Sequence, residues 1–204
     1  KPLALYVYAR DKPLIERVLA NTSAGGSCVN HSMVQFLHAN LLHLGLNMMA
    51  LFVFGPLMEK WWGGRRFLAF YLLCGACGAW LMAVLAYTPL IQPLPGQAGW
   101  LVGASGSVFG LRVGVALVAP KLEVKLIFPP MWITVRRLAV VFFGISLGGL
   151  LLDWNGGGNA AHLGGALFGW VLIRRPWSLD WADPGAPKLD PPSDADDEDK
   201  VETQ

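Results

Sequence analysis

Residues 100–119 read WLVGASGSVFGLRVGVALVA, an apolar segment whose only polar side chains are Ser105, Ser107 and Arg112. Near its start, the run Gly103-Ala104-Ser105-Gly106 places a hydroxyl among small residues. A second apolar segment, at about 159–173, contains the run Ala161-His162-Leu163-Gly164-Gly165 near its own start. A serine and a histidine therefore stand at matching positions in two apolar segments.

The composition indicates a chain that lies mostly in a membrane. Hydrophobic residues make up 54% of the chain and charged residues 15%, and the mean hydropathy is positive. A soluble domain carries about 25% charged residues. Apolar stretches of roughly 20 residues can cross a bilayer core. Five segments approach that length, at about 38–58, 67–87, 100–119, 138–152 and 159–173. We therefore expect an all-α, polytopic membrane helical bundle.

The connections between these segments alternate in charge, which predicts their orientation. Three connections carry basic residues, namely Lys60, Arg65, Arg66, Lys121, Lys125, Arg136, Arg137, Arg174 and Arg175. The connections at about 88–99 and 153–158 carry none. Basic loops remain on the cytoplasmic side of a membrane. The C-terminus is then cytoplasmic, and we expect a multi-pass protein of a bacterial inner membrane.

With this orientation, four polar side chains reach one layer near the outer boundary. Ser105 and His162 lie roughly 5–8 Å inside it, at 1.5 Å per helical residue. His43 and Asn47 enter from the same side and, spaced four residues apart, share one helix face. Polar groups in lipid are costly and usually mark a site. Each also has a plainer interpretation, because a lone serine or histidine in a membrane helix often bonds only its own backbone or a neighbouring helix.

The residue types in this layer fit nucleophilic catalysis. A serine hydroxyl needs a base to accept its proton, and His162 could serve. His43, the amide of Asn47 and the backbone N–H of Ser105 could stabilise an oxyanion. The small residues at 106, 110 and 114, and at 165 and 169, predict close helix packing, which a Ser–His contact also requires. Asp153 lies outside its span, so we predict a dyad, with no metal and no cofactor.

His43-x-x-x-Asn47, Gly103-x-Ser105-Gly106 and Ala161-His162-x-Gly164-Gly165, in this order, resemble the rhomboid intramembrane serine proteases. The resemblance runs from about Val34 to Arg174. It implies that Ser105 is the nucleophile, that His162 is the general base and that His43 and Asn47 are the oxyanion donors. It also implies an aromatic ring at Phe109 against the histidine, supporting glycines at 103, 106 and 165, and transmembrane proteins as substrates. The α/β-hydrolase alternative fails, because position 107 is serine and no strand precedes it.

Two parts of the chain depart from the pattern of that family. Residues 1–37 hold no span comparable to the expected first helix, so we expect that helix upstream of Lys1 and an extramembrane loop segment at 1–37. Val29-Asn30 stands where the family usually has a Trp-Arg or Trp-Gln pair. The resulting division is 1–37, a transmembrane domain at 38–175, and a disordered acidic tail at 176–204, which holds nine of the fourteen acidic residues.

Other polar residues in the apolar segments leave alternatives open. Arg112 could pair with Glu59 or extend its charge to the cytoplasmic interface. Cys74 and Cys77 lack further ligands for a metal and are expected to pack as small apolar residues.

Two other functions compete with proteolysis. A non-catalytic rhomboid-like protein that binds membrane clients is the main alternative, and a channel or transporter is a weaker one, because the sequence shows no internal repeat. We expect contact with the bilayer and no nucleic-acid partner.

Overall fold

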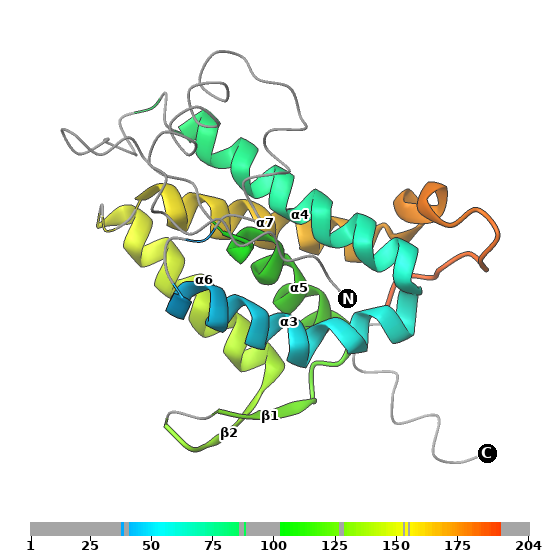
Figure 1. Cartoon of the computed structure of the whole chain (residues 1–204), viewed down its shortest axis with the longest axis horizontal. Coiled ribbons are helices and arrows are strands. Elements are labelled where there is room, and N and C mark those ends of the chain that lie inside the picture. Colours follow the sequence, from blue (N-terminus) through cyan, green and yellow to red (C-terminus); the bar gives the residue numbers. More distant parts are fainter. Residues whose placement is uncertain are drawn as a thin grey trace.

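The computed structural model describes residues 38, 41–85, 88, 103–126, 129–152, 154 and 156–192. The expectations for residues 1–37 and for the acidic run after residue 192 lie outside this part of the chain. Figure 1 shows a bundle of helices with a short β-hairpin at one end. The helices are α3 (Leu41–Trp62), α4 (Gly64–Leu85), α5 (Ser105–Val118), α6 (Val135–Leu151), α7 (Gly156–Arg174) and the 3₁₀ helix η2 (Pro176–Ala182). The hairpin pairs β1 (Glu123–Lys125) with β2 (Trp132–Thr134).

Each of the five predicted apolar segments overlaps one of the α-helices of the described chain, so the helical membrane fold is confirmed. The ends differ from expectation by a few residues. Gly63, at a φ of +78°, alone separates α3 from α4. Thr134 caps α6 by accepting a bond from the Arg137 amide, so this helix starts before the predicted span. The hairpin ahead of it, antiparallel with Val124 opposite Ile133, was not predicted.

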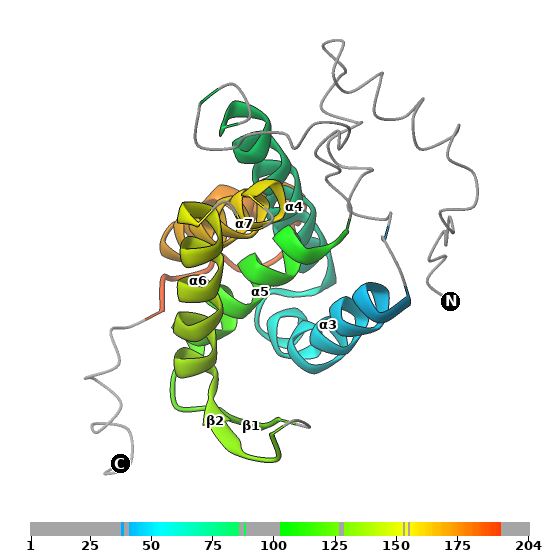
Figure 2. The ribbon, with the colours of Figure 1, turned by 90° about the vertical axis from the view of Figure 1, so that its left-hand side faces the viewer.

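Helix α5 forms the centre of the bundle. It contacts α3, α4, α6 and α7, which surround it in Figure 2. Its 14 residues span only about 21 Å, less than the roughly 30 Å of a bilayer core. Ser105, the first residue of this helix, is half-buried and stands between the buried residues Ala104 and Gly106.

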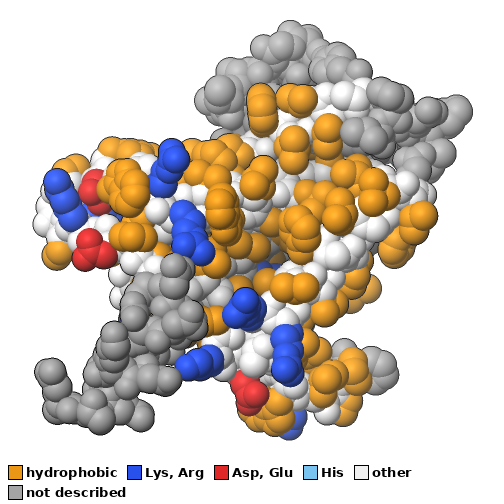
Figure 3. All heavy atoms as spheres, turned by 180° about the vertical axis from the view of Figure 1, so that it is seen from behind, with side chains coloured by type: hydrophobic (Ala, Val, Ile, Leu, Met, Phe, Trp, Pro, Cys, Tyr) orange, Lys and Arg blue, Asp and Glu red, His pale blue; other side chains and the backbone are white. Residues whose placement is uncertain are grey.

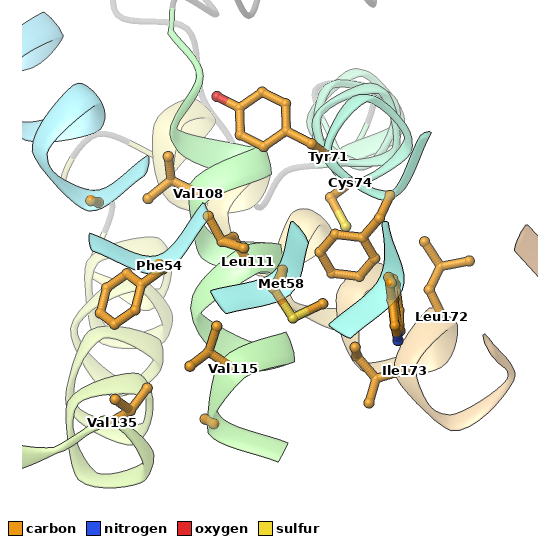
Figure 4. Packing of buried hydrophobic residues seen from close by; sticks show 14 of the residues in the cluster. Phe54, Met58, Tyr71, Cys74, Val108, Leu111, Val115, Val135, Leu172 and Ile173 are labelled. Carbon is orange, nitrogen blue, oxygen red and sulfur yellow. The ribbon is translucent and has the colours of Figure 1, made fainter. Parts of the chain in front are cut away.

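Apolar side chains from each of the α-helices in the described part of the chain fill the space around α5. Figure 4 shows the residues of α5 that take part, Val108, Leu111 and Val115, between those of the neighbouring helices. Met58 of α3 and Ile173 of α7 meet there with no exposed surface. This packing fixes the position of α5 along most of its length.

The outer surface of the bundle is also apolar. Large side chains such as Phe52, Trp80, Val140 and Leu151 are exposed, at 82%, 63%, 66% and 70% respectively. Two of the described helices, α3 and α4, are long and apolar enough to cross a membrane, and α5 is a shorter apolar helix. In Figure 3 orange apolar side chains cover much of the visible described surface. The blue Lys and Arg side chains lie on the left and in the lower half of this view. Such a surface is suited to lipid.

The first part of the predicted disordered tail is structured, which corrects that expectation. Residues 176–192 run back along the N-terminal end of α4, with Leu179 fully buried. Arg66 of α4 explains why. Its guanidinium is 2% exposed, donates to the Asp180 carboxylate at 2.8 Å and to the Pro187 carbonyl at 2.8 Å. A buried cation needs such partners, and the tail supplies them.

Candidate active site

Ser105 is the first residue of the central helix, and the chain just before it is held against α3. Gly103 has a φ of +120°, a conformation that residues with a Cβ rarely adopt. A Cβ at this position would also overlap the imidazole of His43. Glycine at 103 therefore lets the backbone that leads into Ser105 pass directly against His43.

His162 lies in α7, and its ring is held from two directions. The ring of Phe109 stacks on it, with centroids 4.1 Å apart and planes within 5° of parallel. The second contact comes from α6, where Ser146 Oγ lies 3.2 Å from His162 Nδ1. The orientation of this imidazole is thus set by one residue of α5 and one of α6.

Ser146 was not among the residues that the sequence indicated. Its side chain is 2% exposed. One signal could have identified it, because it carries the only polar side chain between residues 138 and 152. The two motifs around Ser105 and His162 do not indicate it, because both lie outside α6.

The two candidate oxyanion donors lie one turn apart on α3. Asn47 is 5% exposed, and within the described chain its Nδ2 has no hydrogen-bond partner. The ring of His43 meets Gly103, as above, and the edge of His38 at a centroid distance of 5.4 Å. A buried amide donor without a protein acceptor is rare and calls for an explanation. A ligand oxygen would provide one.

Glycines bring the helices of Ser105 and His162 into backbone contact. A Cβ on Gly165 of α7 would overlap the backbone of Gly106, the residue after the serine. A Cβ on Gly106 would approach the carbonyl oxygen of Ala161 to 3.2 Å. The same contact continues one turn deeper, where Gly169 meets the backbone of Gly110. The structure therefore brings the residue after Ser105, Gly106, against Ala161 and Gly165, which lie on either side of His162 in the sequence.

Arg112 does not form the pair with Glu59 that was one of the two arrangements expected from the sequence. Its guanidinium carbon lies 4.2 Å from the ring centre of Phe142 and 5.4 Å from that of Phe109. No ion pair joins it to Glu59, whose side chain is exposed; both residues are described. The cation is instead stabilised on aromatic faces, an interaction that strengthens when the charge is removed from water.

The arrangement contains the parts needed for acyl transfer. A hydroxyl at a helix N-terminus, an oriented imidazole and the Asn47 amide, which has no partner among the described residues, lie at the same end of the bundle. The hydroxyl of Ser105 makes no hydrogen bond to His162 in this structure; both side chains are described. Such catalytic bonds often tighten only when substrate binds. Among the described residues no group of three His, Cys, Asp or Glu side chains could hold a metal ion.

One known protein family matches most of this chain. The Rhomboid domain family matches residues 27–175, which is most of the chain. The chain belongs to the rhomboid family. The match includes every helix from α3 to α7 and all of the candidate site residues. A search of solved structures gives no significant match to this rhomboid.

Several named proteins are similar to this rhomboid. The presenilin-associated rhomboid-like protein A, mitochondrial, of Danio rerio is 27% identical over 86% of the chain and 44% of its own length. Rhomboid protein 1, mitochondrial, of Saccharomyces cerevisiae is 32% identical over 68% of the chain and 40% of its own length. Rhomboid protease AarA of Providencia stuartii is 28% identical over 74% of the chain and 56% of its own length. The chain thus spans about half the length of these relatives or less.

Proposed function

We propose that this rhomboid is an intramembrane serine protease that hydrolyses peptide bonds in or near transmembrane segments of other proteins. The observation that carries the proposal is the glycine-mediated contact between the helices of Ser105 and His162. Rhomboid-family proteins act on or bind membrane-protein clients within the bilayer. One relative, AarA, is named a protease.

The first chemical step is attack by Ser105 Oγ on the carbonyl carbon of the scissile peptide. His162 accepts the hydroxyl proton as the C–O bond forms. The negative charge moves to the carbonyl oxygen, where the Asn47 amide, His43 and the Ser105 backbone N–H are the candidate donors. The first N–H groups of an α-helix have no partner within the helix, so that of Ser105 can serve.

The next steps break the C–N bond and then regenerate the free enzyme. The tetrahedral intermediate collapses, and His162 gives its proton to the leaving amine, which leaves an ester on Ser105. Water then attacks this ester while His162 takes its proton. The Ser105 oxygen regains a proton from His162 when the carboxylic acid product departs.

The test is turnover of a reporter protein with one transmembrane segment, placed in liposomes with the purified rhomboid. We expect cleavage by the wild type and none by Ser105→Ala or His162→Ala. Ser105→Ala should keep the thermal midpoint of the wild type in detergent, because the half-buried Ser105 hydroxyl makes no hydrogen bond to His162. His162→Ala should unfold at a lower temperature but remain folded, because it removes the ring that stacks on Phe109 and the partner of Ser146. Equal turnover by Ser105→Ala would disprove the proposal.

A second candidate is a rhomboid that binds membrane clients without cutting them. Two observations favour it. Ser105 and His162 are not hydrogen-bonded to each other, although both are described, and the fish relative is named rhomboid-like rather than a protease. The same liposomes discriminate, since a pure binder would retain the reporter intact in wild type and Ser105→Ala alike.

The sequence also suggested a bacterial inner membrane, with the basic loops and the C-terminus on the cytoplasmic side. Membrane location follows from the family. Both the fish and the yeast relatives are named mitochondrial, so the bacterial location gains no support from them. We propose only that the basic ends of the helices face the inner side of whichever membrane holds the protein.

A further inference from the structure

Ser146 contacts the candidate base from a helix that carries none of the family motifs. Its hydroxyl is 2% exposed and lies 3.2 Å from His162 Nδ1. A hydroxyl buried in an apolar helix is costly unless it bonds a partner. The nitrogen of His162 is that partner.

The stack with Phe109 cannot by itself select which ring nitrogen faces the serine. Parallel stacking at 4.1 Å fixes the plane of the His162 ring. A half-turn about the Cβ–Cγ bond keeps the same plane but exchanges the positions of Nδ1 and Cδ2. A hydrogen bond to Nδ1 removes this ambiguity, because only one of the two ring orientations can form it.

The same bond decides the proton position on the imidazole. A neutral histidine protonates one nitrogen, and the partner of that nitrogen determines which one it is. If Nδ1–H donates to Ser146, Nε2 keeps its lone pair and can act as a base. In the opposite arrangement the Ser146 hydroxyl donates to Nδ1, and the protonated Nε2 cannot accept the proton of Ser105.

We propose that Ser146 is a positioning residue whose Oγ accepts the Nδ1–H of His162 and keeps Nε2 free for Ser105. The inference rests on the proposed function for its catalytic consequence, but the contact itself does not. A serine within a helix can donate its hydroxyl proton to the carbonyl four residues earlier, and the proposal requires that the Ser146 proton points away from His162 in this way. Its oxygen then remains available as an acceptor.

A neutral hydroxyl suits this place better than a carboxylate would. Orienting a catalytic histidine is a task that many hydrolases give to aspartate. At a 2%-exposed position in an apolar helix, an ionised carboxylate would carry a large desolvation cost. A serine gives the same geometric constraint without a charge.

The first experiment compares Ser146→Ala, Ser146→Thr and Leu147→Ala in the liposome assay. We expect kcat to fall about tenfold in Ser146→Ala with an unchanged KM, the scale of one lost hydrogen bond. Ser146→Thr keeps the hydroxyl and should restore most of the rate. Leu147 is the next residue of α6 and is 41% exposed. Leu147→Ala shortens a side chain of the same helix but leaves the bond between Ser146 and His162 in place, so it should match the wild type. A wild-type kcat in Ser146→Ala would overturn the catalytic role.

The second experiment reads the tautomer directly and does not depend on catalysis. Imidazole ¹⁵N NMR of the protein labelled at its four histidines, with His162 assigned from the His162→Gln variant, reports which nitrogen is protonated. The wild type should show Nδ1–H at His162, and Ser146→Ala a shift toward Nε2–H. A wild type with Nε2–H overturns the proposal even if Ser146→Ala fails to fold. If the wild type cleaves nothing but shows Nδ1–H, the proposed proteolysis fails while the Ser146 contact stands.

Discussion

Asn47 carries a buried amide N–H donor, and no described residue accepts a hydrogen bond from it. We predict that this donor serves the oxyanion and not the proton transfer. Loss of one oxyanion donor typically lowers kcat by about 10²–10³. Asn47→Ala should therefore slow turnover in liposomes by about that factor, while a serine-reactive phosphonate still labels the protein.

The control for this prediction is Gly45→Ala on the same helix, where an added Cβ meets nothing within 4 Å. It should retain wild-type turnover. An Asn47→Ala protein with an unchanged turnover number would exclude Asn47 from the oxyanion site.

At the scale of elements, the contact between α5 and α7 depends on glycine at both of its surfaces. Gly165→Ala would drive a Cβ into the backbone of Gly106, so we predict that the helices part. Overpacking costs about 1–3 kcal/mol, and here it also separates Ser105 from His162. The expected result is a lower thermal midpoint in detergent together with a loss of turnover.

Helix α6 offers the matched control, because an added Cβ at Gly144 has nothing within 4 Å. Gly144→Ala should be at least as stable as the wild type, since alanine favours a helix over glycine by about 1 kcal/mol. If Gly165→Ala and Gly144→Ala had equal midpoints and activities, the close packing of α5 and α7 would not matter for the site.

The apolar segments allowed the helices to be predicted, because length and composition are local properties. Spacing placed His43 and Asn47 on one helix face, and glycine runs marked the contact of α5 with α7. Ser146 could not be assigned a partner in this way. Its bond to His162 depends on how α6 packs against α7, and nothing in the local sequence of α6 fixes that register. The stacking of Arg112 on Phe142 could not be predicted either, because it also depends on how α6 packs against its neighbours.

At the scale of the whole molecule, the segment after α7 is held to α4 by one buried charge. Asp180 accepts from Arg66, which is 2% exposed, whereas Asp183 pairs with Arg65, which is 77% exposed. We predict that Asp180→Ala lowers the unfolding free energy by about 1–3 kcal/mol, because it leaves a buried cation short of a partner. Asp183→Ala should change it by less than about 1 kcal/mol.

Thermal unfolding in one detergent measures both variants. Equal midpoints for the two would mean that the Arg66 contact does not hold the segment. The acidic composition of this segment predicted disorder. Composition alone does not show that α4 buries Arg66, which needs the Asp180 carboxylate as a partner.

Two C-terminal truncations test the same contact between this segment and α4. A chain ended after Pro192 keeps the Asp180 and Pro187 contacts of Arg66 and should match the wild type in stability and turnover. A chain ended after Trp181 loses the Pro187 carbonyl and should unfold at a lower temperature. The reverse order of midpoints would contradict the assigned role of the segment.

In the proposed function, Ser105 is a nucleophile that His162 activates. The most direct measurement is mass spectrometry of the purified rhomboid after reaction with a fluorophosphonate, which forms a stable bond to an activated serine. We predict the added mass on the peptide that contains Ser105 in the wild type, and none in His162→Ala. Unmodified Ser105 in a folded wild-type protein, or equal modification in His162→Ala, would contradict it.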